Sequence, residues 1–167
     1  VSHRMIPFFS SRVLDNYEMV RPFWMLWLML ACIAAHGLLQ CFELTGYLWL
    51  ADFPLAACAL YLSYRWQLQR SFQVSLLAVL HISFAWFGVA MVLYAVQSLV
   101  YFASGNFILG LAPLHALGIG FFSGMILAMA SRVTLGHSGR PLELDRFTWL
   151  LFLGFQATAV IRILADL

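Results

Sequence analysis

Residues Pro113–Arg140 read PLHALGIGFFSGMILAMASRVTLGHSGR, and this stretch decides the fold. It contains an apolar run of about 20 residues, Leu114–Val133, which is long enough to cross a bilayer as a helix. His115 lies at the start of the run, and His137 lies just beyond its end. At a rise of ~1.5 Å per residue the two histidines are about 33 Å apart. The stretch therefore predicts a transmembrane helix with one histidine at each membrane face.

Small side chains recur at every fourth position of this run. They are Ala116, Gly120, Gly124 and Ala128. Residues four apart share one face of a helix, and a stripe of small residues lets a neighbouring helix pack closely in a membrane. We therefore expect this run to form the central helix of a bundle.

The composition of the chain points to the same environment. Of its 167 residues, 63% are hydrophobic and 10% are charged, whereas about a quarter of a water-soluble domain is charged. All nine basic residues are arginine, and they form no basic patch that would bind nucleic acid. The three cysteines contain no CxxC pair and no disulfide framework. Membrane lipids are therefore the expected surroundings, and nucleic acid is not an expected partner.

The apolar segments predict an all-α, polytopic membrane bundle of about five transmembrane helices. Their expected ranges are 22–42, 46–64, 73–102, 114–133 and 147–164. No linker or internal repeat divides the chain, so residues 1–167 are predicted to form a single transmembrane domain. Residues 1–21 are expected to be an interfacial segment, because Pro7 should keep a helix from starting early and the residues around it suit the headgroup region.

The arginines predict the orientation of the bundle. With five crossings, eight of the nine fall on the side of the N-terminus, and only Arg162 lies towards the other side. Positively charged loops stay in the cytoplasm. The N-terminus is therefore expected to be cytoplasmic and the C-terminus periplasmic.

The first predicted helix carries a stripe of soft and polar side chains on one face. Met25, Met29, Cys32, His36, Gln40 and Glu43 follow one another at spacings of four and three. Thioether, thiol and imidazole groups are ligands that suit copper, especially Cu(I). We therefore take Met29, Cys32 and His36 as candidate copper ligands. The alternative is a polar stripe that faces the bundle, with the methionines filling gaps.

His81, in the third predicted helix, is a candidate axial ligand of a b-type haem, because small residues on its face would admit a planar ring. No C-x-x-C-H motif is present for covalent attachment. By depth, His81 could act with His137 on the cytoplasmic side, and His36 with His115 on the outer side. The alternative is that His81 is simply hydrogen-bonded inside the bundle.

Charged residues near the helix ends have two interpretations each. Arg132 and Arg140 flank the exit of the fourth predicted helix, and their guanidinium groups suit lipid phosphates or the propionates of a haem. Asp52 is either a proton-relay carboxylate or a helix-end group. Arg162 and Asp166, four residues apart, are expected to pair at the outer boundary.

Several of these segments resemble the NnrS family. The segments LHALGIG (114–120) and MASRVTLGHSGRP (129–141) are similar to its signature, and HRMIPFF (3–9) and LHISFAWF (80–87) agree with two further family segments. The resemblance implies a polytopic protein of the bacterial inner membrane that binds haem and copper and takes part in the response to nitric-oxide stress. The matched positions are His81, His115, His137 and Arg132, with Arg4 and Pro7 in the opening motif. His36 and the stripe around it have no counterpart.

Members of this family are longer, and their RMIPFF-type segment follows several earlier helices. The chain therefore resembles the C-terminal half of the family, and the expected partners are a missing N-terminal half or other membrane subunits. The alternative function is a cofactor-free structural subunit of a larger respiratory or photosynthetic complex. A transporter is disfavoured, because the pair of broken helices expected of an inverted repeat is missing. Whether the protein is an enzyme stays open, since nitric-oxide binding, electron transfer and protection of iron all fit.

Overall fold

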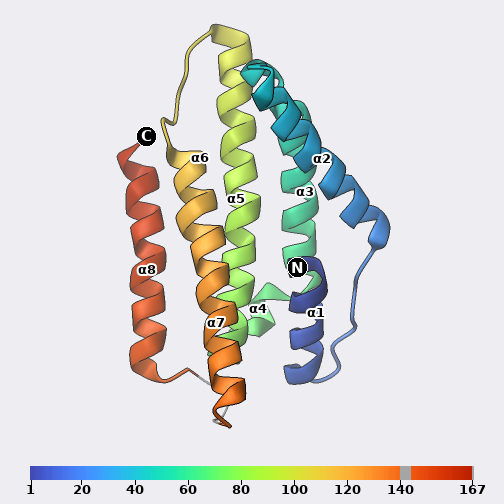
Figure 1. Cartoon of the computed structure of the whole chain (residues 1–167), viewed down its shortest axis with the longest axis vertical. Coiled ribbons are helices and arrows are strands. Elements are labelled where there is room, and N and C mark those ends of the chain that lie inside the picture. Colours follow the sequence, from blue (N-terminus) through green and yellow to red (C-terminus); the bar gives the residue numbers. More distant parts are fainter. Residues whose placement is uncertain (140–143, 167) are drawn as a thin grey trace.

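The structure is a computed structural model, and it describes residues 1–139 and 144–166. Within these ranges every regular element is a helix, which confirms the predicted all-α membrane bundle (Figure 1). The elements are α1 (Ser2–Val13), α2 (Phe23–Cys41), η1 (Thr45–Tyr47), α3 (Trp49–Arg65), α4 (Leu68–Ser71), α5 (Ser75–Ser104), α6 (Ala112–His115), η2 (Ala116–Ser123), α7 (Gly124–His137) and α8 (Arg146–Ala165).

Four helices in the described ranges are long and apolar enough to cross a membrane. They are Phe23–Cys41, Ser75–Ser104, Ala112–His137 and Arg146–Ala165. The third of them joins α6, η2 and α7 into one continuous rod, as the stretch Leu114–Val133 predicts. The remaining expected crossing corresponds to α3, which has 17 residues. At ~1.5 Å per residue it spans about 26 Å, a little less than the ~30 Å hydrocarbon core.

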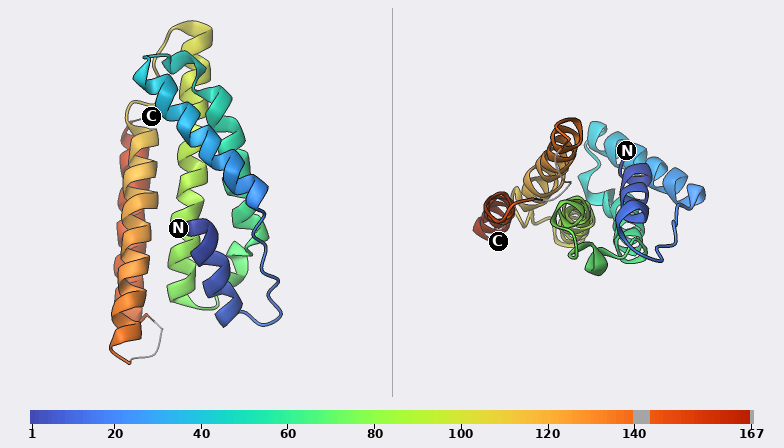
Figure 2. Two further views of the ribbon diagram at one scale, coloured as in Figure 1. Left: turned by 45° about the vertical axis from the view of Figure 1, so that its right-hand side comes forward. Right: turned by 90° about the horizontal axis from the view of Figure 1, so that it is seen from below.

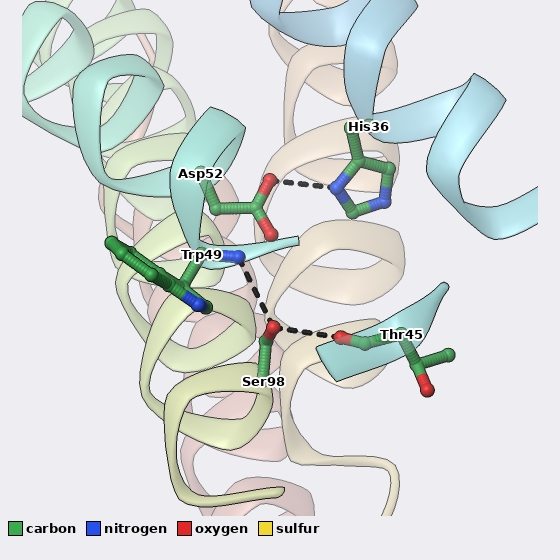
Figure 3. Close-up of polar contacts among 5 residues, drawn as sticks. All are labelled: His36, Thr45, Trp49, Asp52 and Ser98. Carbon is green, nitrogen blue, oxygen red and sulfur yellow. Dashed lines mark hydrogen bonds and ion pairs between the residues drawn. The ribbon is translucent and has the colours of Figure 1, made fainter. Parts of the chain in front are cut away.

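The bundle has two ends, which we call half A and half B. Half A, at the bottom of Figure 1, holds α1, α4, the start of α5 and the end of α7. Half B, at the top, holds the end of α2, the start of α3, α6 and the end of α8. In half B, the Ser98 hydroxyl donates to the Thr45 carbonyl at 2.7 Å and accepts the Trp49 N–H at 3.1 Å (Figure 3). These bonds fix the start of α3 against α5.

The central helix is α5, and the expectation that 114–133 would be central is wrong. Of the most apolar window of α5, 67% is buried, against 22% for Ala112–His137. Figure 2, seen from below, shows α5 between the α7–α8 pair and the α2–α3 pair. A small-residue stripe lets one face of a helix pack closely, whereas α5 is apolar on all its faces and packs against helices on more than one side.

The small-residue stripe itself does face the bundle, as predicted. Its four members are buried. A Cβ on Gly120 would lie 2.5 Å from the ring of Trp86, and one on Gly124 would lie 2.6 Å from Ser83 Oγ. Glycine is therefore required at both positions for the close approach of α5. Part of the rod, η2, is π-helical, and there Ser123 Oγ donates to the Gly118 carbonyl five residues earlier at 2.9 Å.

Residues 2–13 form helix α1, so the prediction that Pro7 prevents a helix here is wrong. Pro7 lies inside the helix, where it removes only one backbone hydrogen bond. Ile6, Pro7 and Ser10 are buried, and α1 packs on α5 in half A (Figure 1). Burial of this face outweighs the loss, as tertiary packing commonly overrides local propensity.

Candidate functional site

His81 lies in the interior of half A, with 2% of its surface exposed. Its Nε2 is 3.0 Å from Ser10 Oγ, and the Ser10 hydroxyl donates to the Ile6 carbonyl at 2.9 Å. A hydroxyl carries a single hydrogen, so Nε2–H must be the donor to Ser10. Helix α1 therefore covers His81 and occupies its Nε2, which leaves Nδ1 as the unprotonated nitrogen.

In His36 the other ring nitrogen, Nδ1, makes the bond. Its Nδ1 lies 2.6 Å from Oδ1 of Asp52, which is fully buried at the start of α3 (Figure 3). Its ring also meets the Tyr94 ring edge-on, with centroids 5.3 Å apart. In Figure 3 the second ring nitrogen, Nε2, points away from the carboxylate. The pair thus fixes the ring and leaves Nε2 without a partner among the described residues.

An apolar cleft of about 360 Å³ lies beside His36, between α2, α3, α5 and η2. Its walls include Met29, Met91, Phe87 and Phe121, besides His36 itself. The rings of Phe87 and Phe121 are 5.1 Å apart. The cleft is within the size range of small-molecule sites, which are mostly apolar with a few polar groups.

The other end of the same cleft reaches His3 and Trp66. The His3 ring lies 6.1 Å from the Trp66 ring, and its Nε2 is buried without a hydrogen-bond partner in the described part of the chain. Burial lowers the pKa of His3, which therefore favours the neutral imidazole. His3 was not among the residues predicted to form a site.

His115 pairs with Asp166 across the end of half B, with Nδ1 and Oδ2 2.8 Å apart. The expectation that Asp166 pairs with Arg162 is therefore wrong. Since α6 and α8 lie side by side, Asp166 reaches a histidine 51 positions away in the chain. His36 and His115 share half B, as their depth predicted, but each has its own carboxylate.

The remaining candidates fall into different places. Met29 and Cys32 are buried, so this part of the stripe on α2 faces the protein. Within the described ranges, no group of three His, Cys, Asp or Glu residues could hold a metal ion. His137 is exposed at the end of α7, whereas His81 is buried. Arg140 lies outside the described residues.

Arg132 is buried on α7, with 6% of its surface exposed. Its guanidinium carbon lies 3.9 Å from the centre of the Phe9 ring, which belongs to α1. Nε and Nη2 are buried, and neither has a hydrogen-bond partner among the described residues. A buried guanidinium with two free donors is a group that needs an acceptor.

Sequence reasoning named His36 and His115 but missed the carboxylates as their partners. A signal for Asp52 was available. The short connection between α2 and α3 makes an antiparallel pair, so the last turns of α2 face the first turn of α3. His36 and Asp52 lie in those turns. Ser10 gave no such signal, because its segment was not expected to be helical.

Comparison with known proteins gives one match, which is to a family. Nothing among curated proteins or solved structures matches the chain. The sequence model of the NnrS family, described as NnrS protein, matches residues 1–167. This agrees with the segments in which the chain resembles that family and with its membrane-length helices. The chain is therefore a multi-pass membrane protein that belongs to the NnrS family.

Proposed function

We propose that this protein binds haem in the bacterial inner membrane and takes part in defence against nitric oxide. Membership of the NnrS family supports the link to nitric-oxide stress. The four membrane-length helices support the location. The arginines gathered in half A favour a cytoplasmic half A and a periplasmic half B.

The observation that carries the proposal is the geometry of His36. Histidines that ligate a metal nearly always donate their other N–H to a carboxylate, a carbonyl or water, which fixes the ring and strengthens the ligand. His36 meets this condition through Asp52 at 2.6 Å. His115 meets it through Asp166 at 2.8 Å. In both pairs the carboxylate takes Nδ1, so Nε2 is left for the metal.

The kinds of side chain around His36 suit a haem. Its cleft is walled by aromatic and thioether side chains, which suit the faces of a planar ring. His36 would hold the haem iron through Nε2, and Asp52 would hold the His36 ring in place. A bound haem iron supplies a centre that binds nitric oxide and exchanges electrons. His81 is bonded to Ser10 through Nε2 and does not line this cleft, so it would hold α1 on α5 rather than bind the haem.

Copper is the second candidate, and one observation favours it. Met29 and Met91, from two different helices, line the cleft that His36 also lines. Thioether and imidazole groups together suit Cu(I). Cys32 is buried on the same helix as His36 and one turn away. In that case His36 would bind copper instead of the haem iron.

The proposal is tested by the absorption spectrum and the metal content of the purified protein. We expect a Soret band, and we expect the variant His36→Ala to lose it while the protein stays in the membrane. His137→Ala is the matched control, because His137 is exposed at a helix end, and it should keep the band. A colourless protein with stoichiometric copper would favour the second candidate. A colourless protein without any metal would instead favour the cofactor-free structural subunit.

A further inference from the structure

The buried guanidinium of Arg132 identifies a second place where the protein meets a ligand. A charge inside a membrane protein is normally paired or neutralised. Arg132 has Nε and Nη2 free of any described partner. Neither of the ion pairs in the described part of the chain includes it, since both join a histidine to an aspartate. Its counter-charge therefore comes from a group outside these residues.

The geometry of the free edge indicates the chemistry of that group. Nε and Nη2 lie on the same edge of the guanidinium plane, and this edge matches two oxygens of a phosphate or carboxylate. The flat face of the group is taken by the Phe9 ring at 3.9 Å. A bidentate oxyanion bound at the edge would leave this stacking in place.

The depth of Arg132 indicates where the oxyanion lies. Arg132 sits at the last turn of the apolar run Leu114–Val133, so it is close to the boundary between hydrocarbon and headgroups. From there to the end of α7 at His137 is about 7.5 Å of helix rise. Neighbouring Val133 is 53% exposed, so this turn of α7 borders lipid. Lipid phosphates lie at this depth.

The charge of half A favours an anionic lipid. Helix α1, which supplies Phe9, also carries Arg4 and Arg12 on its exposed surface. Basic residues at the membrane surface attract anionic headgroups. We propose that Arg132 binds the phosphate of an anionic phospholipid, with Phe9 of α1 stacked on the guanidinium as the wall of the site. The lipid thereby joins α1 to α7.

The experiment measures the thermal stability of the purified protein in detergent, with added phosphatidylglycerol or phosphatidylcholine, and counts bound lipids by native mass spectrometry. The parent protein should be stabilised by phosphatidylglycerol and not by phosphatidylcholine. Arg132→Gln should weaken this binding about tenfold or more, the effect of losing charged hydrogen bonds. Arg162→Gln is the matched control, because Arg162 is exposed in the last turn of α8 in half B, away from the arginines of half A, and it should behave like the parent.

Arg132→Lys covers the case in which Arg132→Gln fails to fold. Lysine keeps the charge but cannot donate two parallel hydrogen bonds from one planar group. It should therefore retain the fold and respond less to phosphatidylglycerol than the parent does. Equal responses of the parent to both lipids, or an unchanged response in Arg132→Lys, would overturn the proposal.

Two further arms identify the source of the oxyanion. Stabilisation by inorganic phosphate alone would replace the lipid with a free anion. Loss of haem from Arg132→Gln with unchanged lipid binding would assign the edge to a haem carboxylate. Both results would overturn a lipid site. None of the lipid measurements requires haem, so failure here is distinct from failure of the proposed function.

Discussion

His36 and His81 lie in the same bundle, yet they offer different nitrogens. His36 gives Nδ1 to Asp52 and keeps Nε2 free beside a cleft, whereas His81 gives Nε2 to Ser10 under α1. Burial alone would favour His81, which is the more deeply buried of the two. Each ring leaves one nitrogen unused, so the comparison shows that the better ligand candidate is the histidine that also lines a cleft, which of the two is His36.

The largest effect expected is all-or-none and concerns which half faces the cytoplasm. Single cysteines at Ser138, in half A, and at Asn106, in half B, would be labelled with a membrane-impermeant thiol reagent in whole cells. The background should carry Cys41→Ser, because Cys41 is exposed. We expect Asn106→Cys to react from the periplasm and Ser138→Cys to react only after lysis. Reaction at Ser138→Cys in intact cells would reverse the two halves.

Replacing Asp52, the buried carboxylate of half B, should produce the largest change in stability. Asp52→Asn removes the fully buried carboxylate of the pair with His36, and removing one member of a buried pair lowers the free energy of unfolding by about 3 kcal/mol. Asp166→Asn breaks the partly exposed pair with His115 and should lower it by less than about 1 kcal/mol. Chemical denaturation in detergent measures both. Similar losses in the two variants would show that burial does not distinguish the pairs.

The contact between α7 and α5 should respond to added volume. In Gly124→Leu the new side chain would start 2.6 Å from Ser83 Oγ, and overpacking of this kind lowers the free energy of unfolding by about 2 kcal/mol. Gly118→Leu is the control, because a Cβ there meets nothing within 4 Å. Melting temperatures that fall equally in both variants would argue against the close approach at Gly124.

The smallest effect is expected at Ser10, the residue of α1 that is hydrogen-bonded to His81. Ser10→Ala removes the acceptor of the His81 Nε2–H and should lower the free energy of unfolding by about 1 kcal/mol. Ser11→Ala, next to it, removes an exposed bond to the Phe8 carbonyl and should have almost no effect. If haem binding rises in Ser10→Ala while stability falls, His81 competes with His36 as a ligand, and the contrast between them weakens.

The sequence alone predicts most of the fold but only part of the site. Long apolar runs show where the membrane helices lie, because the bilayer demands them. Helix α1 could not be predicted, since Pro7 is a local breaker and the burial of Ile6 that offsets it is a tertiary contact. Asp166 was assigned to Arg162 for a similar reason: spacing along one helix is visible in a sequence, whereas the neighbouring position of His115 is not.

The π-helical stretch η2 lets the rod hold one extra residue without turning the helix that follows it. Each residue of an α-helix turns the chain by about 100°, and a π-helical turn holds one residue more than an α-helical turn. Deleting one residue from Ala116–Ser123 would therefore let the stretch return to α-helical winding with nearly the same total rotation. Arg132 would still face Phe9, and His115, which comes before the stretch, would stay with Asp166. The same deletion in α7 before Arg132 would instead rotate Arg132 by about 100°, because that segment is already α-helical. The rod therefore tolerates the loss of one residue in η2 but not in the part of α7 before Arg132.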